Sequence, residues 1–160
     1  MKNTSHRGIA LLVAVIFMSV MLTFGVLLGS LAYKQTVLTS STIESQYAFY
    51  AADAGLECGL YYGQQLNYFA FPASQPASAP SITCNGPAPV TATQTWTASQ
   101  WTVNNRIGLD SKRCVDVTVV VKNTGATTIF SQGYDAPCLA GTLPNAPGTR
   151  FVSRGLKASY

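Results

Sequence analysis

The chain has 160 residues, enough for one globular domain and one further segment but not for two domains. Charged residues make up only 10% of it, against about a quarter in an average globular protein. The net charge of +4 is spread over ten basic and six acidic residues that form no dense basic run, which argues against a nucleic-acid-binding surface.

Residues 9–32 form an uncharged apolar segment, IALLVAVIFMSVMLTFGVLLGSLA. As a helix it would be about 36 Å long, which is enough to cross the ~30 Å hydrocarbon core of a membrane. Lys2 and Arg7 precede it, so the positive-inside rule predicts a single-pass cell membrane protein whose C-terminal domain lies outside the cytoplasm. The alternative is a secretory signal cut before Tyr33, but the apolar region of such a signal is only about 7–15 residues long.

The basic leader meets the apolar segment at Arg7-Gly8-Ile9. This arrangement resembles the class III signal of type IV prepilins and secretion pseudopilins, and residues 7–13, RGIALLV, resemble the start of tip pseudopilins and some minor pilins. The resemblance implies that a prepilin peptidase cuts after Gly8 and that Ile9 becomes the N-methylated first residue. The family's usual glutamate at the fifth mature position is replaced here by Val13, which departs from the pattern of ordinary shaft subunits.

The helix is predicted to continue beyond the membrane segment, because residues 33–65 contain no proline and keep helical spacing. Ser41 and Glu44 match a capping box, which would start a new helix, but the continuous spacing favours two polar residues in mid-helix. Small residues recur every three to four positions and predict a narrow face that a sheet can approach closely. They are Ala48, Ala51, Ala52, Gly55, Cys58 and Gly59.

Residues 46–58 read QYAFYAADAGLEC. This stretch resembles a segment that recurs in bacterial minor pilin-like proteins at the same distance from the leader. The resemblance covers residues 7 to about 62, with a looser similarity at the C-terminal strand. Asp53 and Glu57 are an acidic pair four residues apart, which we interpret as contacts to neighbouring subunits or to the domain's own sheet rather than as a metal or catalytic site.

The residues beyond the helix predict a β-rich domain. Residues 72–81 are rich in Pro, Ala and Ser and predict an extended connection. The aromatic residues before it are predicted to hold a loop onto the core: Tyr61, Tyr62, Tyr68, Phe69 and Phe71. Period-two patterns then predict strands at 81–84, 93–97, 100–103, 113–122, 127–132 and 149–160, with a hairpin turn at Asn123-Thr124-Gly125.

Four cysteines lie beyond the apolar segment: Cys58, Cys84, Cys114 and Cys138. They form no CxxC pair and have no histidine nearby, so two disulfides in an oxidising compartment are favoured over zinc ligation. The predicted hairpin brings Cys138 close to Cys114. The favoured pairs are therefore Cys114–Cys138 and Cys58–Cys84, among three possible connectivities.

Together these features predict an α+β fold, the pilin-like lollipop, in which a long N-terminal helix packs on a small antiparallel sheet. The helix has a transmembrane half and an exported half. The expected domains are a leader at 1–8, the transmembrane half at 9–32, the exported half at 33–66 and a disulfide-bearing antiparallel β domain at 67–160.

The sequence offers little catalytic chemistry. The only histidine is His6, which lies in the predicted leader, so the mature chain would have no histidine for a Ser-His-Asp triad or a metal site. Asp110, Asp116 and Asp135 could gather around a calcium ion, but isolated surface aspartates are the favoured interpretation. We expect no catalytic residues, no metal and no cofactor, and therefore not an enzyme.

The resemblance implies a structural minor pilin or pseudopilin that assembles into a type IV pilus-like or secretion filament, with the tip as one position. The filament would be extracellular or periplasmic. The expected partners are the prepilin peptidase, other pilin or pseudopilin subunits, an inner-membrane assembly platform and membrane lipid, without nucleic acid. The alternative is a monomeric, membrane-anchored or secreted, adhesin-like binding domain. The filament could belong to a pilus, a secretion system or a DNA-uptake apparatus, and the sequence does not distinguish the three.

Overall fold

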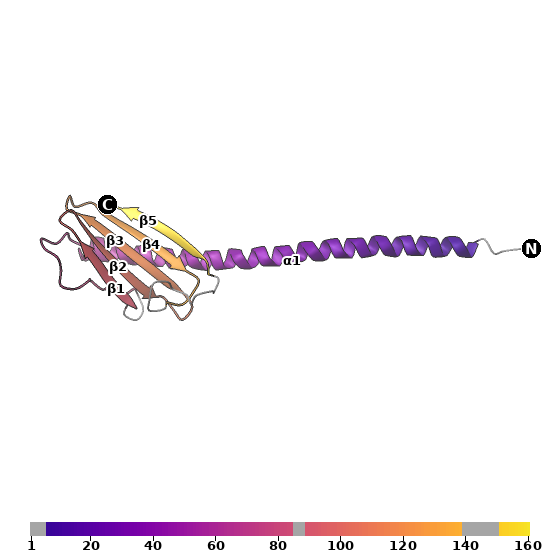
Figure 1. Cartoon of the computed structure of the whole chain (residues 1–160), viewed down its shortest axis with the longest axis horizontal. Coiled ribbons are helices and arrows are strands. Elements are labelled where there is room, and N and C mark those ends of the chain that lie inside the picture. The colour runs from indigo at the N-terminus through magenta and orange to yellow at the C-terminus, as the bar shows by residue number, and fades with distance from the viewer. Residues whose placement is uncertain (1–5, 85–88, 139–150) are drawn as a thin grey trace, which may run out of the picture. The chain divides into compact units, whose positions relative to one another are not determined.

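The computed structural model describes residues 6–84, 89–138 and 151–160. A single long helix, α1 (His6–Leu60), continues into a π-helical turn, η1 (Tyr61–Gln65). Five strands follow, as Figure 1 shows: β1 (Thr91–Trp96), β2 (Gln100–Gly108), β3 (Cys114–Lys122), β4 (Thr127–Tyr134) and β5 (Ser153–Ser159). The chain divides into two compact units, one up to Ser41 and one from Thr42, and each is described by itself. The α+β fold expected from the sequence is confirmed.

The sheet is an antiparallel meander in which strand order follows sequence order, β1-β2-β3-β4-β5. Alternation along each strand gives the sheet two faces. The inner face carries the core and includes the fully buried Val115, Val117 and Val119 of β3. The outer face carries polar residues such as Asn104 and Thr118, which lie opposite each other on β2 and β3.

The part of α1 from Thr42 onward packs on the inner face through its small residues. Ala48, Ala51 and Ala52 are at most 1% exposed, and Gly55 and Gly59 are buried. A methyl group added at Gly59 would lie 3.1 Å from Ile129 and 3.2 Å from Val117, so the helix lies close to β3 and β4 there. The narrow small-residue face predicted from the sequence is confirmed.

The helix is continuous through Ser41 and Glu44, so the capping-box pattern does not start a new helix. Ser41 Oγ donates a hydrogen bond to the carbonyl of Leu38 in the preceding turn, at 2.9 Å. The aromatic cluster lies as predicted in part: Phe69 is buried in the core and Tyr62 and Phe71 pack against it, whereas Tyr61 and Tyr68 are exposed.

Residues 81–84 were predicted to form a strand, and this prediction is wrong. The segment is extended but pairs with no strand, because its polar groups bond to side chains instead. Ile82 N–H donates to Asn105 Oδ1, and Thr83 N–H donates to the Tyr62 hydroxyl oxygen, both at 3.3 Å. Asn105 Nδ2 in turn donates to the carbonyl of Pro80 at 3.1 Å. The segment therefore lies on the inner face, where Ile82 is fully buried.

Two strands are longer than predicted. One strand was predicted at residues 100–103, ending where the apolar pattern gives way to Asn104-Asn105-Arg106. In the structure this strand, β2, continues to Gly108. Cross-strand bonds hold these polar residues in the sheet, since Thr118 Oγ1 donates to Asn104 Oδ1 at 2.8 Å. Strand β4 likewise runs to Tyr134, and β5 begins at Ser153. The expected strand at 149–160 falls partly outside the described residues, as do residues 1–5 of the expected leader.

Candidate functional site

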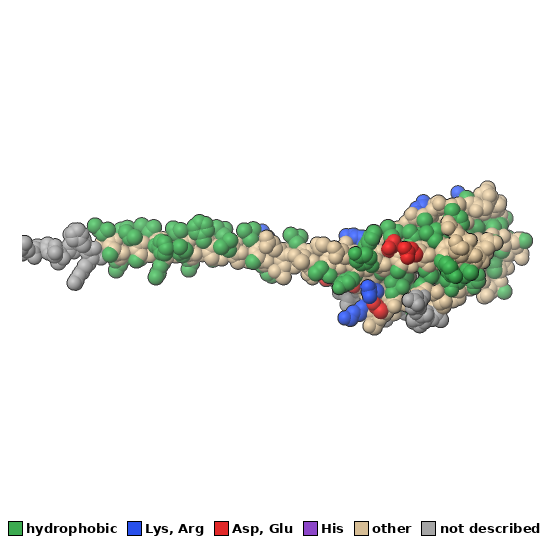
Figure 2. Space-filling model, turned by 180° about the vertical axis from the view of Figure 1, so that it is seen from behind, with side chains coloured by type: hydrophobic (Ala, Val, Ile, Leu, Met, Phe, Trp, Pro, Cys, Tyr) green, Lys and Arg blue, Asp and Glu red, His purple; other side chains and the backbone are tan. Residues whose placement is uncertain are grey.

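The most extensive exposed apolar surface belongs to the N-terminal part of α1. Every side chain of residues 9–32 is exposed, and hydrophobic groups cover this stretch in Figure 2. The helix is long and apolar enough to cross a membrane. Its few hydroxyl groups bond within the helix: Ser19, Thr23 and Ser30 each donate to the carbonyl three residues earlier, at 2.7–2.8 Å. A helix that satisfies its own polar groups is suited to apolar surroundings.

The residues expected to govern processing and docking lie at the start of this surface. Gly8 lies within α1, and Ile9 is 62% exposed on it. Val13 lines a shallow apolar groove with Ile16, Phe17 and Val20. The groove contains no charge, so it can accept only an apolar partner, such as a lipid chain or another apolar helix.

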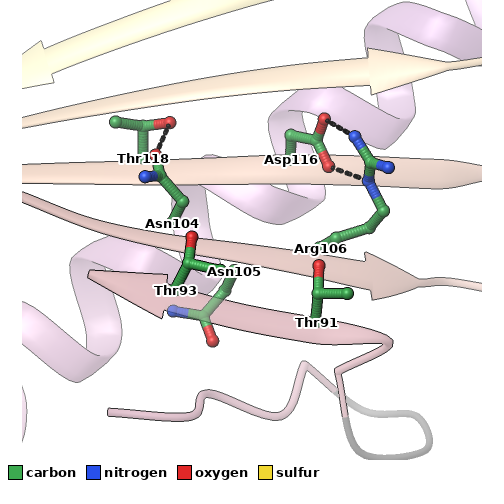
Figure 3. Close-up of a pocket in the computed structure, with 7 residues that line it drawn as sticks. All are labelled: Thr91, Thr93, Asn104, Asn105, Arg106, Asp116 and Thr118. Atoms are coloured by element: carbon green, nitrogen blue, oxygen red, sulfur yellow. Dashed lines mark hydrogen bonds and ion pairs between the residues drawn. The ribbon is translucent and has the colours of Figure 1, made fainter. Parts of the chain in front are cut away.

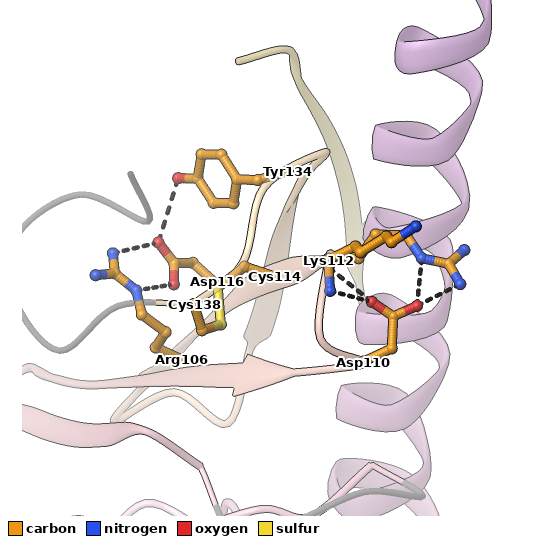
Figure 4. Close-up of a disulfide and its surroundings, with 8 residues drawn as sticks. Arg106, Asp110, Lys112, Cys114, Asp116, Tyr134 and Cys138 are labelled. Carbon is orange, nitrogen blue, oxygen red and sulfur yellow. Dashed lines mark hydrogen bonds and ion pairs between the residues drawn. A yellow bond between two sulfur atoms is a disulfide. The ribbon is translucent and has the colours of Figure 1, made fainter. Parts of the chain in front are cut away.

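The four cysteines form two disulfides, Cys58–Cys84 and Cys114–Cys138, which are the two pairs favoured from the sequence. The first ties the end of α1 to the extended segment before β1. The second ties the start of β3 to the chain beyond β4 (Figure 4). The first bridge thus fixes a segment outside the sheet to the helix, and the second fixes another such segment to a strand.

Next to the second disulfide, Arg106, Asp116 and Tyr134 join three strands on the outer face (Figure 4). Arg106 donates twice to the Asp116 carboxylate, from Nε at 2.7 Å and Nη2 at 2.8 Å, and the Tyr134 hydroxyl donates to the same carboxylate at 3.2 Å. Burial and the negative charge of Asp116 raise the pKa of Tyr134 to about 12. The Asp116 carboxylate also raises the pKa of Arg106. This arrangement cross-links the sheet and uses both carboxylate oxygens of Asp116.

The three aspartates considered for calcium do not gather. Asp110 accepts bonds from the backbone N–H groups of Lys112 and Arg113 and from Arg113 Nε, and the Arg113 bond lowers the pKa of Asp110. Asp110 and Asp135 line one small pocket. The pKa of Asp135 is raised, mainly by burial and also by repulsion from Glu44. Asp116 belongs to a different pocket.

No group of three or more His, Cys, Asp or Glu residues in the described part of the chain is arranged to hold a metal ion. Asp110, Asp116 and Asp135 therefore do not form the joint calcium site that was the less favoured alternative, because arginines pair with two of the three carboxylates. Asp53 and Glu57 form no ion pair with other described residues. Their expected role in contacts between subunits stays a prediction.

A polar pocket of about 370 Å³ lies on the outer face, between β1, β2 and β3 (Figure 3). Hydroxyl, amide, guanidinium and carboxylate groups line it, from Thr91, Thr93, Asn104, Asn105, Arg106, Asp116 and Thr118. This pocket was not predicted from the sequence, because the apolar pattern that indicates the strand ends at Val103 whereas β2 continues to Gly108. The signal was present in the period-two threonines of β1 and in the polar residues that follow Val103.

A long N-terminal helix packed on a five-stranded antiparallel sheet is an α+β layout consistent with the pilin-like fold. The apolar surface of residues 9–32 adds a candidate membrane span to this layout. Comparison with known proteins finds no matching family model, no matching curated protein and no matching solved structure.

Proposed function

We propose that this chain is a structural subunit of a type IV pilin-like filament, a minor pilin or pseudopilin without catalytic activity. Before assembly, residues 9–32 hold it in the membrane with the domain outside the cytoplasm. During assembly the same residues pack against the apolar helices of other subunits. The proposed partners are the prepilin peptidase, other pilin or pseudopilin subunits, the inner-membrane assembly platform and membrane lipid.

One observation carries the proposal: none of the side chains of residues 9–32 is covered by the rest of the described chain. Exposed apolar area costs about 25 cal/mol per Å², so a surface of this size needs an apolar environment. Lipid supplies one environment and the helices of neighbouring subunits supply another. A subunit that moves from membrane to filament uses both.

The sequence at the start of α1 supports both the proposed membrane orientation and the proposed processing of the chain before assembly. Lys2 and Arg7 favour a cytoplasmic N-terminus, and Arg7-Gly8-Ile9 resembles a prepilin cleavage site. Cleavage after Gly8 would remove the basic leader and leave residues 9–32 as the N-terminal end of the mature chain. The buried small-residue face lies in the second unit, so the apolar surface of residues 9–32 is free for other contacts.

The proposal is tested by following the full chain in cells that also express a prepilin peptidase and a type IV assembly system. Filaments are sheared from the cells and separated from membranes, and both fractions are probed with an antibody to the domain. We expect mature chain in the filament fraction. Phe17→Gln keeps the segment uncharged but puts an amide in the apolar groove, and it should lower the filament signal while the membrane signal persists.

The matched control is Thr124→Gln, in the exposed loop between β3 and β4, which should leave both fractions unchanged. Chain that stays entirely in the membrane fraction, with or without the Phe17 change, would contradict the filament proposal. That result would favour the second candidate function, a monomeric anchored binding domain.

The observation that favours a binding domain is the polar pocket on the outer face. Its threonine hydroxyls, amides and guanidinium suit a polyhydroxylated ligand such as an oligosaccharide. The full chain in detergent, applied to a glycan array, tests this function directly. Binding that disappears in Thr93→Lys would support it, whereas an array without signal would count against it.

A further inference from the structure

Strand β1 is one of the two edges of the sheet, and its outer edge has unpaired backbone groups. Thr97 and Gln100 exchange hydrogen bonds at the turn, with Thr97 N–H donating to the Gln100 carbonyl at 2.8 Å. Bonding alternates along an antiparallel pair, so Thr95, Thr93 and Thr91 also direct their backbone groups to β2. The backbone groups of Ala92, Gln94 and Trp96 therefore point away from the sheet.

The backbone N–H and C=O groups of these three residues have no hydrogen-bond partner in the described part of the chain. Among the described residues before β1, Pro76, Pro80 and Ile82 do not pair with this edge, since their backbone groups bond to side chains on the inner face. One of them is Gln94 Nε2, which donates to the carbonyl of Pro76 at 2.8 Å. The Gln94 side chain is held by the inner face while its backbone stays free at the edge.

The two edges of the sheet differ in composition. Strand β5 carries Arg154, Gly155 and Lys157, and charge and glycine are common means of preventing strand addition at an edge. Strand β1 reads TATQTW and carries no charge, glycine or proline. It is therefore the edge that is open to pairing with another strand.

The β1 sequence is complementary to itself. If two copies of β1 meet antiparallel about a twofold axis at Gln94, the backbone of Ala92 pairs with that of Trp96 in the other copy. On the inner face, the small Ala92 then lies opposite the large Trp96. On the outer face, Thr93 lies opposite Thr95, and both side chains are exposed and able to bond across the strands.

We propose that β1 is a homotypic docking edge, through which two copies of this chain join antiparallel into one continuous sheet. About six backbone hydrogen bonds would form, two for each of the three pairs. The axis is perpendicular to the sheet, so the segments of α1 from Thr42 onward run in opposite directions in the two copies. The contact thus joins two domains in opposite orientations, unlike the subunits that follow one another in a single filament, and it goes beyond assembly within one filament.

The register is tested by cysteine cross-linking of the full chain in detergent. Thr93→Cys and Thr95→Cys are prepared separately, mixed and oxidised. Positions 93 and 95 form a non-hydrogen-bonded pair, with Cα atoms about 4.5 Å apart, which is within the range of a disulfide. We expect disulfide-linked dimers in the mixture and few in either variant alone. Peptide mapping of the dimers should show that Cys58–Cys84 and Cys114–Cys138 are intact.

The matched control is a mixture of Thr102→Cys and Asn104→Cys, which have the same spacing on the outer face of β2 but lie on a strand paired on both sides. Ala92→Pro removes one of the free N–H groups without removing a bond to β2. It should weaken association at least about tenfold, measured by the concentration dependence of cross-linking in the Cys variants.

Thr93→Lys with Thr95→Lys places like charges opposite each other and should abolish association with the circular dichroism spectrum unchanged. The proposal is overturned if the 93 and 95 mixture yields no more dimer than the 102 and 104 control. It is also overturned if Thr95→Cys links to Lys157→Cys of the other edge instead.

Discussion

Gly133 on β4 lies directly against the backbone of α1 at Ala48. A methyl group added to Gly133 would overlap the Ala48 carbonyl oxygen and the Ala52 nitrogen. Both atoms belong to the main chain of a helix and cannot move aside as a side chain could. The absence of a side chain at Gly133 and the small side chains of Ala48 and Ala52 together set the distance between helix and sheet.

Gly133→Ala should therefore destabilise the domain by about 3 kcal/mol or more, at the upper end of the usual cost of overpacking. The measurement is urea unfolding of the full chain in detergent, followed by tryptophan fluorescence. Gly108→Ala in β2 is the control, because its added methyl group would meet only the Asp110 carbonyl oxygen at 4.0 Å. Equal stability of the two variants would show that the helix does not lie this close to β4.

Each disulfide should contribute roughly 2–4 kcal/mol to the stability of so small a domain. Replacing Cys58 and Cys84 together by serine should free the extended segment before β1, and replacing Cys114 and Cys138 together should free the chain beyond β4. Unfolding of the two double variants measures the two contributions separately. Non-reducing peptide mapping of the wild-type chain that joined Cys58 to Cys114 or Cys138 would refute the pairing.

Stability should fall at alkaline pH because of Tyr134. Its pKa is about 12 in the folded chain and about 10 in an unfolded chain, so ionisation opposes folding. The stabilising contribution is complete below pH ~10 and is lost as the pH rises through ~12. Ultraviolet titration should show a tyrosine that ionises near pH 12 and is missing in Tyr134→Phe, and the variant should lose less stability over this range. A titration curve unchanged by the substitution would contradict the burial of this hydroxyl beside Asp116.

The mature chain should begin at Ile9 and carry an N-methyl group. The reason is the resemblance of Arg7-Gly8-Ile9 to a prepilin cleavage site before an apolar segment too long for a secretory signal. Mass spectrometry of the chain extracted from membranes decides the point. A terminus at Tyr33 would instead establish a secretory signal, and an intact Met1 would rule out both kinds of processing.

Val13 leads to a prediction about position in the filament. In the pilin family, the fifth-position glutamate is thought to pair with the N-terminal ammonium of the subunit above it. A buried unpaired charge costs about 2.5–3.5 kcal/mol on insertion scales, so this pairing favours docking. With Val13 the chain cannot satisfy an ammonium above it, although its own Ile9 amine can pair with a glutamate below.

Only the first subunit of a filament has nothing above it, so we expect this chain at the tip. Immunogold labelling of sheared filaments should place the label at one end. Label spread evenly along the shaft would instead identify a sparse shaft subunit whose unpaired neighbour is tolerated. Val13→Glu supplies the missing carboxylate and should move label into the shaft.

The sequence by itself determined the long helix, the small-residue face and the hairpin from β3 to β4, because these depend on local periodicity and turn residues. It also favoured the two cysteine pairs seen in the structure, because the hairpin brings Cys114 close to Cys138 and leaves Cys58 and Cys84 for each other. Each of these features follows from residues that are close in sequence or joined by one short turn.

Only the tertiary structure decided where β2 ends, that residues 81–84 do not form a strand, and which side chains pair with the aspartates. Arg106 remains in β2 because Asp116 of β3 neutralises it, and Ile82 bonds to the side chain of Asn105 rather than to a strand. These outcomes depend on partners that only the strand register brings together. The sequence alone does not show whether a polar residue lies in a loop or in a strand, because this depends on its cross-strand partner.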